Sequence, residues 1–398
     1  MEAIILVGGL GTRLRPVVGD VPKPLAPIQD RPFLDYLLWF LWLNGIKKVI
    51  LAAGHKNEHF IEKYREGFKD LDIRFSIEEK PLGTGGAVKK ALGLADGENV
   101  LVLNGDTFFA VNLRALIDLH KKNATDITMA IKSVKESERY GSIVLDGTGK
   151  VISMREKGSH GEALISGGIY LINKKNLNFD LEAFSFEEYL GVSLKSLKIM
   201  GYRSDSFFID IGIQDDYKKT QKLLPNFSFF NDWTLFLDRD GVINEEIKND
   251  YVRKWEDLKF IDKNVGFLRD FTNYFKRVYI VTNQQGVGKG LMTERDLQDI
   301  HSRMLQRLRK IGVKIDGINY CPDKEESNSD CRKPNTGMFR EIKEKDSAVS
   351  FEKSITIGDS ESDVMAAKRI GSIPVLLGGD KNHDDVLCVN ELSDLLFT

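Results

Sequence analysis

Short apolar segments alternate with longer helical patterns through the whole chain, and this alternation most constrains the fold. In the first half such segments, rich in leucine and β-branched residues, occupy residues 3–7, 47–52, 100–103 and 127–131. Buried strands of parallel sheets have this composition, and the longer patterns between them fit crossover helices. The sequence therefore predicts an α/β protein built on mainly parallel sheets.

The chain is expected to form two domains. Its 398 residues exceed what one hydrophobic core usually supports. The helical pattern of the first half ends between Leu223 and Asn226, and a new strand-like segment begins at Thr234. We place the domains at residues 1–228 and 229–398, and we expect the second to be a doubly wound parallel sheet.

The segment at residues 32–44 (PFLDYLLWFLWLN) is apolar almost all the way round. It begins with Pro32 at a plausible first helical position and stops at Gly45. A helix without a polar face is usually buried, so we predict a core helix here. A dimer interface is the alternative, and a homo-oligomer therefore stays open.

Charge and targeting signals point to small-molecule partners in the cytoplasm. With 57 Lys and Arg against 59 Asp and Glu, the formal charge of -2 favours neither nucleic acid nor a membrane surface. The first residues lack a signal-peptide pattern, and no segment is apolar for long enough to span a bilayer. Three cysteines are too few for a disulfide framework, so we expect them to be reduced.

A glycine-rich loop follows the first apolar segment. It contains Gly8, Gly9 and Gly11, with Thr12 and Arg13 directly after them. Glycines let successive backbone N–H groups converge on a phosphate, and Arg13 would add charge on the same anion. By itself the loop is also compatible with a structural turn or a dinucleotide fold, so other features must decide.

Those features resemble the sugar-1-phosphate nucleotidyltransferases over about the first 225 residues. The family's GGxGTRL signature is followed here by Lys23-Pro24-Leu25. The further matching segments are Pro81 to Gly86, Leu103 to Asp106, Arg155 to Lys157, Ser166 to Tyr170 and Phe208 to Gly212. The resemblance implies a Rossmann-like nucleotidyltransferase domain with a mixed, mainly parallel sheet.

In this family a sugar 1-phosphate oxygen attacks the α-phosphorus of a nucleoside triphosphate, and pyrophosphate leaves. The resemblance implies that Asp106 and Asp210 bind Mg²⁺, while Lys23 and Arg13 steady the triphosphate. It places Gly8, Gly9, Gly11, Thr12, Gly83, Thr84 and Gly105 at the nucleotide, and Glu156, Lys157 and Gly168 at the sugar phosphate. The Gly83 loop alone does not distinguish guanine from the other bases.

A second acidic motif, Asp238-Arg239-Asp240-Gly241, follows the segment that begins at Thr234. Two carboxylates spaced by one residue lie on the same side of an extended chain, where one can attack and the other can transfer a proton. A lone motif of this kind is about as often a metal clip or a turn. Three more segments, at 281–283, 331–334 and 357–363, complete a resemblance to the haloacid dehalogenase superfamily phosphatases.

That resemblance assigns roles in the second domain. Asp238 would form an aspartyl-phosphate, and Asp240 would protonate the leaving oxygen and then activate water. Thr282 would donate to the phosphate, and Lys333 would offset its charge. Mg²⁺ would be bound by Asp238, Asp359 and the Asp240 main chain, with Asp363 in support, because such a cluster of acids is too repulsive without a cation.

Within this superfamily the motifs look most like heptose bisphosphate and histidinol phosphatases. Asn283 and Arg332 would then contact the substrate, Arg332 at the sugar or its anomeric phosphate. Such relatives usually have a zinc loop of Cys and His before the Arg-Lys-Pro segment. Here the corresponding region offers Cys321, Asp323, Ser329 and Cys331, so we predict a loop without structural zinc.

Together the two resemblances imply a bifunctional enzyme of nucleotide-sugar synthesis. The phosphatase would remove the 7-phosphate of D-glycero-D-manno-heptose 1,7-bisphosphate, and the transferase would join the heptose 1-phosphate to a nucleotide, with GTP favoured by family analogy. A mannose-1-phosphate guanylyltransferase fused to a phosphatase for another substrate, such as histidinol phosphate, is the alternative. A regulator with inactive sites is a third hypothesis, disfavoured because both acid sets are complete.

Overall fold

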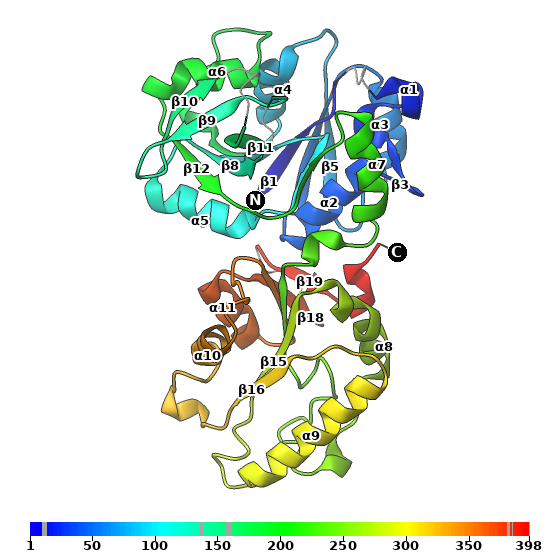
Figure 1. Cartoon of the computed structure of the whole chain (residues 1–398), viewed down its shortest axis with the longest axis vertical. Coiled ribbons are helices and arrows are strands. Elements are labelled where there is room, and N and C mark those ends of the chain that lie inside the picture. Colours follow the sequence, from blue (N-terminus) through cyan, green and yellow to red (C-terminus); the bar gives the residue numbers. More distant parts are fainter. Residues whose placement is uncertain (10–13, 136–137, 156–160, 380–382, 384, 398) are drawn as a thin grey trace. The chain divides into compact units, whose positions relative to one another are not determined.

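The computed structural model describes residues 1–9, 14–135, 138–155, 161–379, 383 and 385–397. The chain divides into two compact units, Met1–Pro225 and Asn226–Thr398, shown in Figure 1. Each unit has its own sheet, and the two are described separately below. In the described residues no helix combines the length and the apolarity needed to cross a membrane.

Nine strands of the described first unit form one sheet. Its strands are β1 (Glu2–Leu6), β4 (Lys48–Ala53), β5 (Asp72–Ile77), β6 (Asn99–Asn104), β8 (Ile127–Val134), β9 (Ser142–Leu145), β10 (Val151–Arg155), β11 (Ala163–Asn173) and β12 (Ile199–Arg203). The order is β10-β9-β11-β6-β1-β4-β5, with β8 paired to β11 and β12. Strands β6, β1, β4 and β5 are parallel, whereas β11 is antiparallel to β6, β8 and β9. The mixed, mainly parallel sheet predicted from the sequence is confirmed.

Two short strand pairs, seven α-helices and three short 3-10 helical turns, Lys23–Leu25, Lys174–Asn176 and Ser193–Lys195, complete the described part of this unit. The pairs are β2 (Pro27–Ile28) with β3 (Arg31–Pro32), and β7 (Thr107–Phe109) with β13 (Phe208–Asp210). The helices are α1 (Arg15–Val18), α2 (Phe33–Leu43), α3 (Asn57–Tyr64), α4 (Gly83–Leu92), α5 (Leu113–Asn123), α6 (Phe186–Val192) and α7 (Gln214–Leu223). Every residue of α2 is buried, which confirms the predicted core helix, although Pro32 caps the helix rather than starting it.

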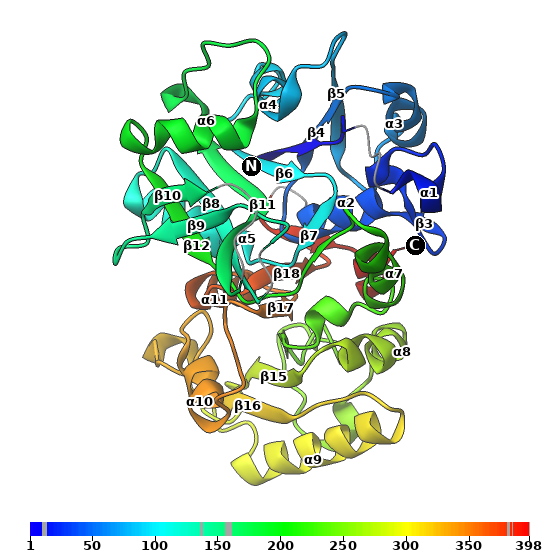
Figure 2. The same ribbon diagram turned by 45° about the horizontal axis from the view of Figure 1, so that its top comes forward.

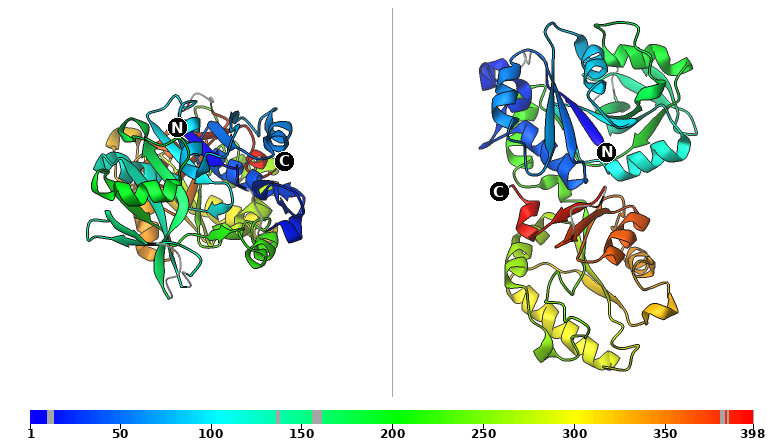
Figure 3. Two further views of the ribbon diagram at one scale, coloured as in Figure 1. Left: turned by 90° about the horizontal axis from the view of Figure 1, so that it is seen from above. Right: turned by 180° about the vertical axis from the view of Figure 1, so that it is seen from behind.

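The second unit is a sheet of six described strands in the order β16-β15-β14-β17-β18-β19, all parallel. Its strands are β14 (Thr234–Leu237), β15 (Arg277–Asn283), β16 (Gly317–Cys321), β17 (Ser354–Gly358), β18 (Ile373–Leu377) and β19 (Leu387–Val389). Its helices are α8 (Asp262–Phe271), α9 (Glu294–Lys310), α10 (Gly337–Lys345) and α11 (Glu361–Ile370). Figures 1 and 3 show α8 and α9 on one side of this sheet and α10 and α11 on the other, so the predicted doubly wound arrangement is confirmed.

Parallel pairing determines where the polar motifs meet. In the first unit Leu6 is in register with Ala52 and Asn104, so the segments after β1, β4 and β6 leave the sheet at one edge. In the second unit Leu237 is in register with Ile280 and Ile357, which brings together the segments after β14, β15 and β17. The carboxyl ends of parallel strands are the usual position of ligand sites in α/β sheets.

Candidate active sites

In the first unit a short antiparallel pair brings together Asp106 and Asp210, which are about 100 positions apart in sequence. Asp106 lies in the turn between β6 and β7, and Asp210 is the last residue of β13. Thr107 is paired with Asp210 across the two strands, and the Ile211 N–H donates to the Asp106 carbonyl oxygen at 3.0 Å. The predicted pair of metal acids therefore occupies one site.

A buried lysine lies between these two acids. The Lys23 Nζ is 2.5 Å from Asp106 Oδ2 and 3.6 Å from Asp210 Oδ1, and its side chain is only 10% exposed. Burial raises the pKa of Asp210, and the charge of Asp106 adds to this effect, while Lys23 opposes it. The Gly212 N–H also donates to Asp210 Oδ1 at 2.6 Å. Both carboxylates are therefore held by cationic or N–H groups.

A cavity of about 550 Å³ opens beside this pair. Its lining includes five of the residues predicted to bind nucleotide, Gly8, Gly9, Gly83, Thr84 and Gly105, together with Lys23 and Asp106. Gly83 has φ +70°, and a Cβ there would lie 2.5 Å from the Phe184 carbonyl oxygen, so this turn requires glycine. The volume falls within the range of small-ligand pockets.

Some predicted residues of the first site are placed differently. Gly168 does not appear in the cavity lining; it packs against Asn104, whose Nδ2 would lie 3.0 Å from a Cβ at this glycine. The predicted residues Gly11, Thr12, Arg13, Glu156 and Lys157 lie outside the described residues.

Sequence reasoning missed two carboxylates that line the cavity and one nearby arginine. Glu78 follows β5, and Glu187 lies in the first turn of α6; both line the cavity. Arg139 contacts Asp216 at 2.6 Å and lies 3.6 Å from Asp210. An acid after a strand or in a first helical turn is usually a cap or part of a solvated face, so only the fold distinguishes these residues.

In the second unit three carboxylates converge at the ends of neighbouring parallel strands. Asp238 follows β14, Asp359 follows β17, and Asp363 lies in the first turn of α11. Ligand atoms of all three lie within 4.8 Å of one another. Gly241 has φ +73°, and a Cβ there would lie 1.7 Å from Asp359 Oδ2, so the glycine of the Asp-Arg-Asp-Gly segment makes room for this acid.

Lys333 neutralises part of the negative charge of this carboxylate cluster. Its Nζ donates to Asp238 Oδ1 at 2.7 Å, to Asp363 Oδ1 at 2.6 Å and to the Val281 carbonyl oxygen at 2.6 Å. Burial acts to lower the pKa of Lys333, but the two carboxylates outweigh burial and raise it. Burial raises the pKa of Asp238 despite Lys333, and burial with the nearby Asp363 charge raises the pKa of Asp359 to about 7.

The chemistry of this set fits a hard divalent cation. Oxygen ligands are what Mg²⁺ prefers, and three acids with one lysine leave excess negative charge. The raised pKa values of Asp238 and Asp359 have the same physical origin, because buried carboxylates without enough positive charge favour the protonated form. Asp238 and Asp359 come together as the sequence predicted, and Asp363 joins them.

The Asp240 carboxylate points into a separate network. Burial acts to raise the pKa of Asp240, but the charge and hydrogen bonds of Arg239, with amide donors from Asn244 and Gln284, hold it below its ordinary value. Arg239 Nη2 lies 2.8 Å and 2.9 Å from the two Asp240 oxygens. Its Nη1 donates to His301 Nε2 at 3.2 Å, and burial lowers the pKa of that histidine to about 3. His301 lies in α9, and no motif pointed to it.

The remaining predicted residues of the second unit tie its loops together. Thr282 is buried and accepts from Gln284 Nε2 at 2.8 Å. The Asn283 side chain donates to the Lys333 carbonyl oxygen at 3.1 Å and accepts from the Lys333 N–H at 3.0 Å. Arg332 donates to the Asp323 carbonyl oxygen at 3.3 Å. These contacts hold the segment that carries Lys333 beside the end of β15.

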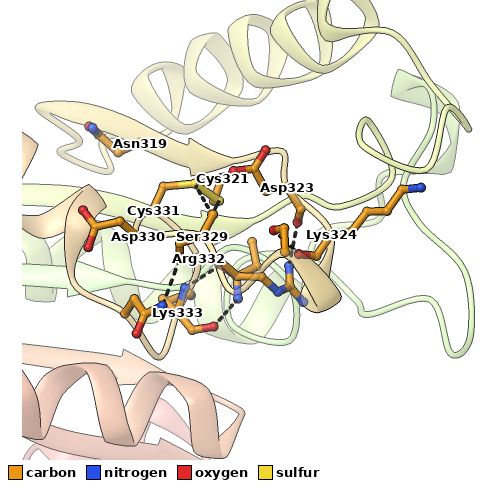
Figure 4. The surroundings of a disulfide bond; sticks show 12 residues. Asn319, Cys321, Asp323, Lys324, Ser329, Asp330, Cys331, Arg332 and Lys333 are labelled. Atoms are coloured by element: carbon orange, nitrogen blue, oxygen red, sulfur yellow. Dashed lines mark hydrogen bonds between the residues drawn. A yellow bond between two sulfur atoms is a disulfide. The ribbon is translucent and has the colours of Figure 1, made fainter.

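The expectation that the cysteines are reduced is wrong for two of the three. Cys321, the last residue of β16, forms a disulfide with Cys331, and Figure 4 shows this bond beside Ser329 and Asp323. The intervening loop returns so that the two Cα atoms lie 5.4 Å apart, within the range that a disulfide spans. Asp323 and the two cysteines form a group of potential metal ligands, whereas structural zinc sites use four N or S ligands. Sequence spacing alone did not reveal this loop closure.

Comparisons with known proteins match each of the two units to a protein family. Residues 2–217 match the nucleotidyl transferase family, and residues 234–374 match the family described as polynucleotide kinase 3 phosphatase. The chain is 47% identical over 230 residues to D-glycero-alpha-D-manno-heptose 1-phosphate guanylyltransferase of Aneurinibacillus thermoaerophilus, covering 57% of this chain and 100% of that relative. An enzyme of the same name from Campylobacter jejuni is 47% identical over 219 residues, covering 54% and 97%.

A crystal structure also matches the first unit. HddC from Yersinia pseudotuberculosis, complexed with GMP-PN, aligns with a TM-score of 0.51 and 33% identity over 56% of this chain and 99% of that one. The chain therefore belongs to the nucleotidyl transferase family, and it also carries a phosphatase-type domain. Both resemblances stated from the sequence are confirmed, and the chain is an enzyme with two kinds of catalytic domain.

Single substitutions should separate the two activities. We expect Asp238→Asn to lower phosphatase activity at least about 10³-fold, as removal of a nucleophile does in other enzymes, and to leave nucleotidyl transfer unchanged. Asp106→Ala should do the reverse. Release of phosphate and of pyrophosphate, measured on the same preparations, checks both. Activity of both kinds in both variants would contradict our placement of the sites.

Reduction of the disulfide should destabilise the second unit. The loop closed by Cys321 and Cys331 spans 10 positions, for which chain entropy predicts about 2–3 kcal/mol. We expect dithiothreitol to lower the unfolding temperature of this unit by roughly 5–10 °C, measured by calorimetry. Cys331→Ser should show the lower temperature with or without the reductant. An identical unfolding temperature for the wild type in both conditions would show that the bond does not form in solution.

Proposed function

We propose that this enzyme converts a heptose bisphosphate into GDP-heptose in two steps. The second unit removes the 7-phosphate of D-glycero-D-manno-heptose 1,7-bisphosphate, and the first unit joins the resulting heptose 1-phosphate to GTP with release of pyrophosphate. The observation that carries the proposal is the 47% identity to a heptose 1-phosphate guanylyltransferase over that relative's whole length. The product of the phosphatase step is the nucleophile of the transfer step, which gives one chain a reason to hold both domains.

In the first unit the sugar phosphate oxygen attacks the α-phosphorus of GTP, so no protein nucleophile is needed. Lys23 and Arg13 stabilise the negative charge that moves onto the leaving pyrophosphate. Glu156, Lys157 and Gly168 bind the sugar phosphate. Mg²⁺ held by Asp106 and Asp210 would supply the remaining positive charge at the triphosphate.

In the second unit Asp238 attacks the phosphorus of the 7-phosphate and forms an aspartyl-phosphate. The sugar oxygen leaves with a proton from Asp240, and Asp240 then accepts a proton from the water that hydrolyses the intermediate. The lowered pKa of Asp240 favours its role as the base that accepts a proton from water. The negative charge of the incoming phosphate raises this pKa and so favours its role as the acid that protonates the leaving oxygen. Thr282 and Lys333 bind the transferred phosphate, and Asn283 and Arg332 hold the loop at the substrate. Mg²⁺ held by Asp238, Asp359 and the Asp240 main chain would offset the charge of the phosphate.

Small sugar phosphates suit the second unit better than a polynucleotide does. The chain is almost balanced in charge, with 57 basic and 59 acidic residues, and thus lacks the excess of basic residues that phosphate backbones require. We therefore propose small-molecule substrates for both sites. We also propose that the reaction takes place in the cytoplasm, where nucleoside triphosphates are made, and that structural zinc plays no role.

The preference for GTP is supported by Glu78. This carboxylate lines the first-unit cavity next to the Gly83 turn, and its Oε2 accepts the Leu82 N–H at 3.2 Å. Guanine presents adjacent N–H donors from its ring and its exocyclic amine, whereas uracil and thymine present one ring N–H. A carboxylate can accept both guanine donors, so Glu78 is suited to read this base.

A direct reconstitution tests the pathway. Purified enzyme incubated with heptose 1,7-bisphosphate, GTP and Mg²⁺ should yield GDP-heptose, one phosphate and one pyrophosphate per turnover, because each site performs one step. Chromatography with mass detection identifies the nucleotide sugar. Formation of a UDP- or dTDP-sugar instead, or of GDP-mannose from mannose 1-phosphate with no action on the heptose, would contradict the proposal.

Substitution of Glu78 tests the choice of base. We expect Glu78→Gln to lower kcat/KM for GTP about tenfold to a hundredfold, because the NH₂ group of the glutamine side chain would face one of the guanine N–H groups, and two donors cannot form a hydrogen bond. The same constant for UTP should change far less. Glu79→Gln, at the adjacent exposed residue, is the matched control. Equal losses with both nucleotides would assign Glu78 a structural role only.

A further inference from the structure

Gln284 is a buried side chain of the phosphatase site to which neither the sequence motifs nor the two-step reaction assigns a role. It directly follows β15, which Figures 1 and 2 show beside β16, and it is 2% exposed. Its Nε2 donates to Asp240 Oδ2 at 2.8 Å and to Thr282 Oγ1 at 2.8 Å. One amide nitrogen therefore joins the predicted proton-transfer carboxylate to the predicted phosphate-binding hydroxyl.

The surroundings of Asp240 determine which end of the Gln284 amide faces it. Arg239 Nη2 donates to both Asp240 oxygens, at 2.8 Å and 2.9 Å, and Asn244 Nδ2 donates to Oδ1 at 2.8 Å. A carboxylate paired with an arginine in this way is ionised and only accepts hydrogen bonds. The Gln284 atom beside it must therefore be the NH₂ nitrogen, which has one hydrogen for Asp240 and one for Thr282.

Donation by Gln284 determines what the Thr282 hydroxyl can offer a ligand. A threonine hydroxyl has one hydrogen and two acceptor lone pairs, and Gln284 occupies a lone pair. Among the described residues Gln284 is the hydrogen-bond partner of this hydroxyl, whose residue is only 1% exposed. The hydroxyl hydrogen is thus left for a ligand, and an ionised phosphate oxygen, which only accepts, is its complementary partner.

The backbone fixes Gln284 independently of its side chain. Its N–H donates to the carbonyl oxygen of Cys321, the last residue of β16, at 2.7 Å, and its own carbonyl oxygen accepts the Val287 N–H at 3.3 Å. Asp240 would keep Arg239 and Asn244 as donors without the Gln284 amide. Removal of this amide should therefore leave the backbone in place and remove only the shared hydrogen bonds.

We propose that Gln284 is a positioning residue of the phosphatase, which fixes Asp240 relative to Thr282 and directs the Thr282 hydroxyl hydrogen toward the bound phosphate. The inference rests on the roles that the proposed function gives to Asp240 and Thr282, and it adds the residue that links them. Proton transfer to the leaving oxygen requires that the phosphate held by Thr282 has a fixed position relative to Asp240, and a shared donor provides this.

A double-mutant cycle on the full chain tests this link. Gln284→Met keeps the length of the side chain and removes its N–H donors. With heptose 1,7-bisphosphate we expect it to lower phosphatase kcat about tenfold to a hundredfold, the effect of losing hydrogen bonds to reacting groups. In a Thr282→Val background the factor should be at least about fivefold smaller, because the hydroxyl that Gln284 directs is absent.

The adjacent residue provides the matched control for this cycle. Gln285→Met removes a side chain whose Oε1 accepts the Glu325 N–H at 3.4 Å, and it should keep the wild-type kcat. Calorimetry of each variant shows whether the second unit is folded, and nucleotidyl transfer by the same preparations should be unchanged. Gln284→Ala takes the place of Gln284→Met in the cycle if the Met variant does not fold.

The remaining outcomes separate this inference from the proposed function. An equal loss of kcat in both backgrounds would assign Gln284 a structural role only, and an unchanged kcat would remove it from the site, so either result overturns the inference. Wild-type enzyme inert toward the bisphosphate but active on p-nitrophenyl phosphate would overturn the proposed function, and the same cycle with p-nitrophenyl phosphate would then decide the role of Gln284. Wild-type enzyme inert toward both substrates would overturn both.

Discussion

Both sites of this enzyme depend on a buried lysine that sits among carboxylates. Lys23 bridges Asp106 and Asp210 in the first unit, and Lys333 bridges Asp238 and Asp363 in the second. Carboxylates gathered in a buried place repel one another and would take up protons without a nearby cation. The lysines offset this repulsion only in part, because the pKa values of Asp210, Asp238 and Asp359 remain raised. The charge still to be balanced is what makes both sites suited to a divalent metal ion.

The two units bring their acids together in different ways, through parallel strand ends in the second unit and through a short antiparallel pair in the first. Neighbouring parallel strands end at one edge, so acids that follow separate strands meet without any long excursion of the chain. In the second unit this applies to Asp238 and Asp359 directly, through the register of β14 with β17. In the first unit the short pair β7 and β13 performs the same task for Asp106 and Asp210. Lys23, in a short helical turn, completes the site of the first unit, and Lys333, in a loop, completes the site of the second.

The residues of the two sites differ in whether they could be predicted from the sequence. The strands, the buried helix α2 and the acids of both motifs could be predicted, because apolar periodicity and local spacing encode them. Glu78, Glu187 and His301 could not, since each is an ordinary polar residue of a strand end or a helix. Their importance comes from what lies opposite them in space. The Cys321–Cys331 disulfide was missed for the same reason, as spacing does not show where a loop returns.

The sequence by itself determined the α/β class and the presence of two catalytic domains, and it predicted the acids and glycines of the two sites. Local spacing is sufficient for these, because a strand, a tight turn and a pair of acids are formed by neighbouring residues. Only the tertiary structure decided which lysine balances which acids, that Asp240 is held by Arg239, Asn244 and Gln284, and that Glu78 and Glu187 line the first cavity. These contacts join residues as distant in sequence as Lys23 and Asp210, which are 187 positions apart, and they arise from strand register and helix packing that no local pattern contains.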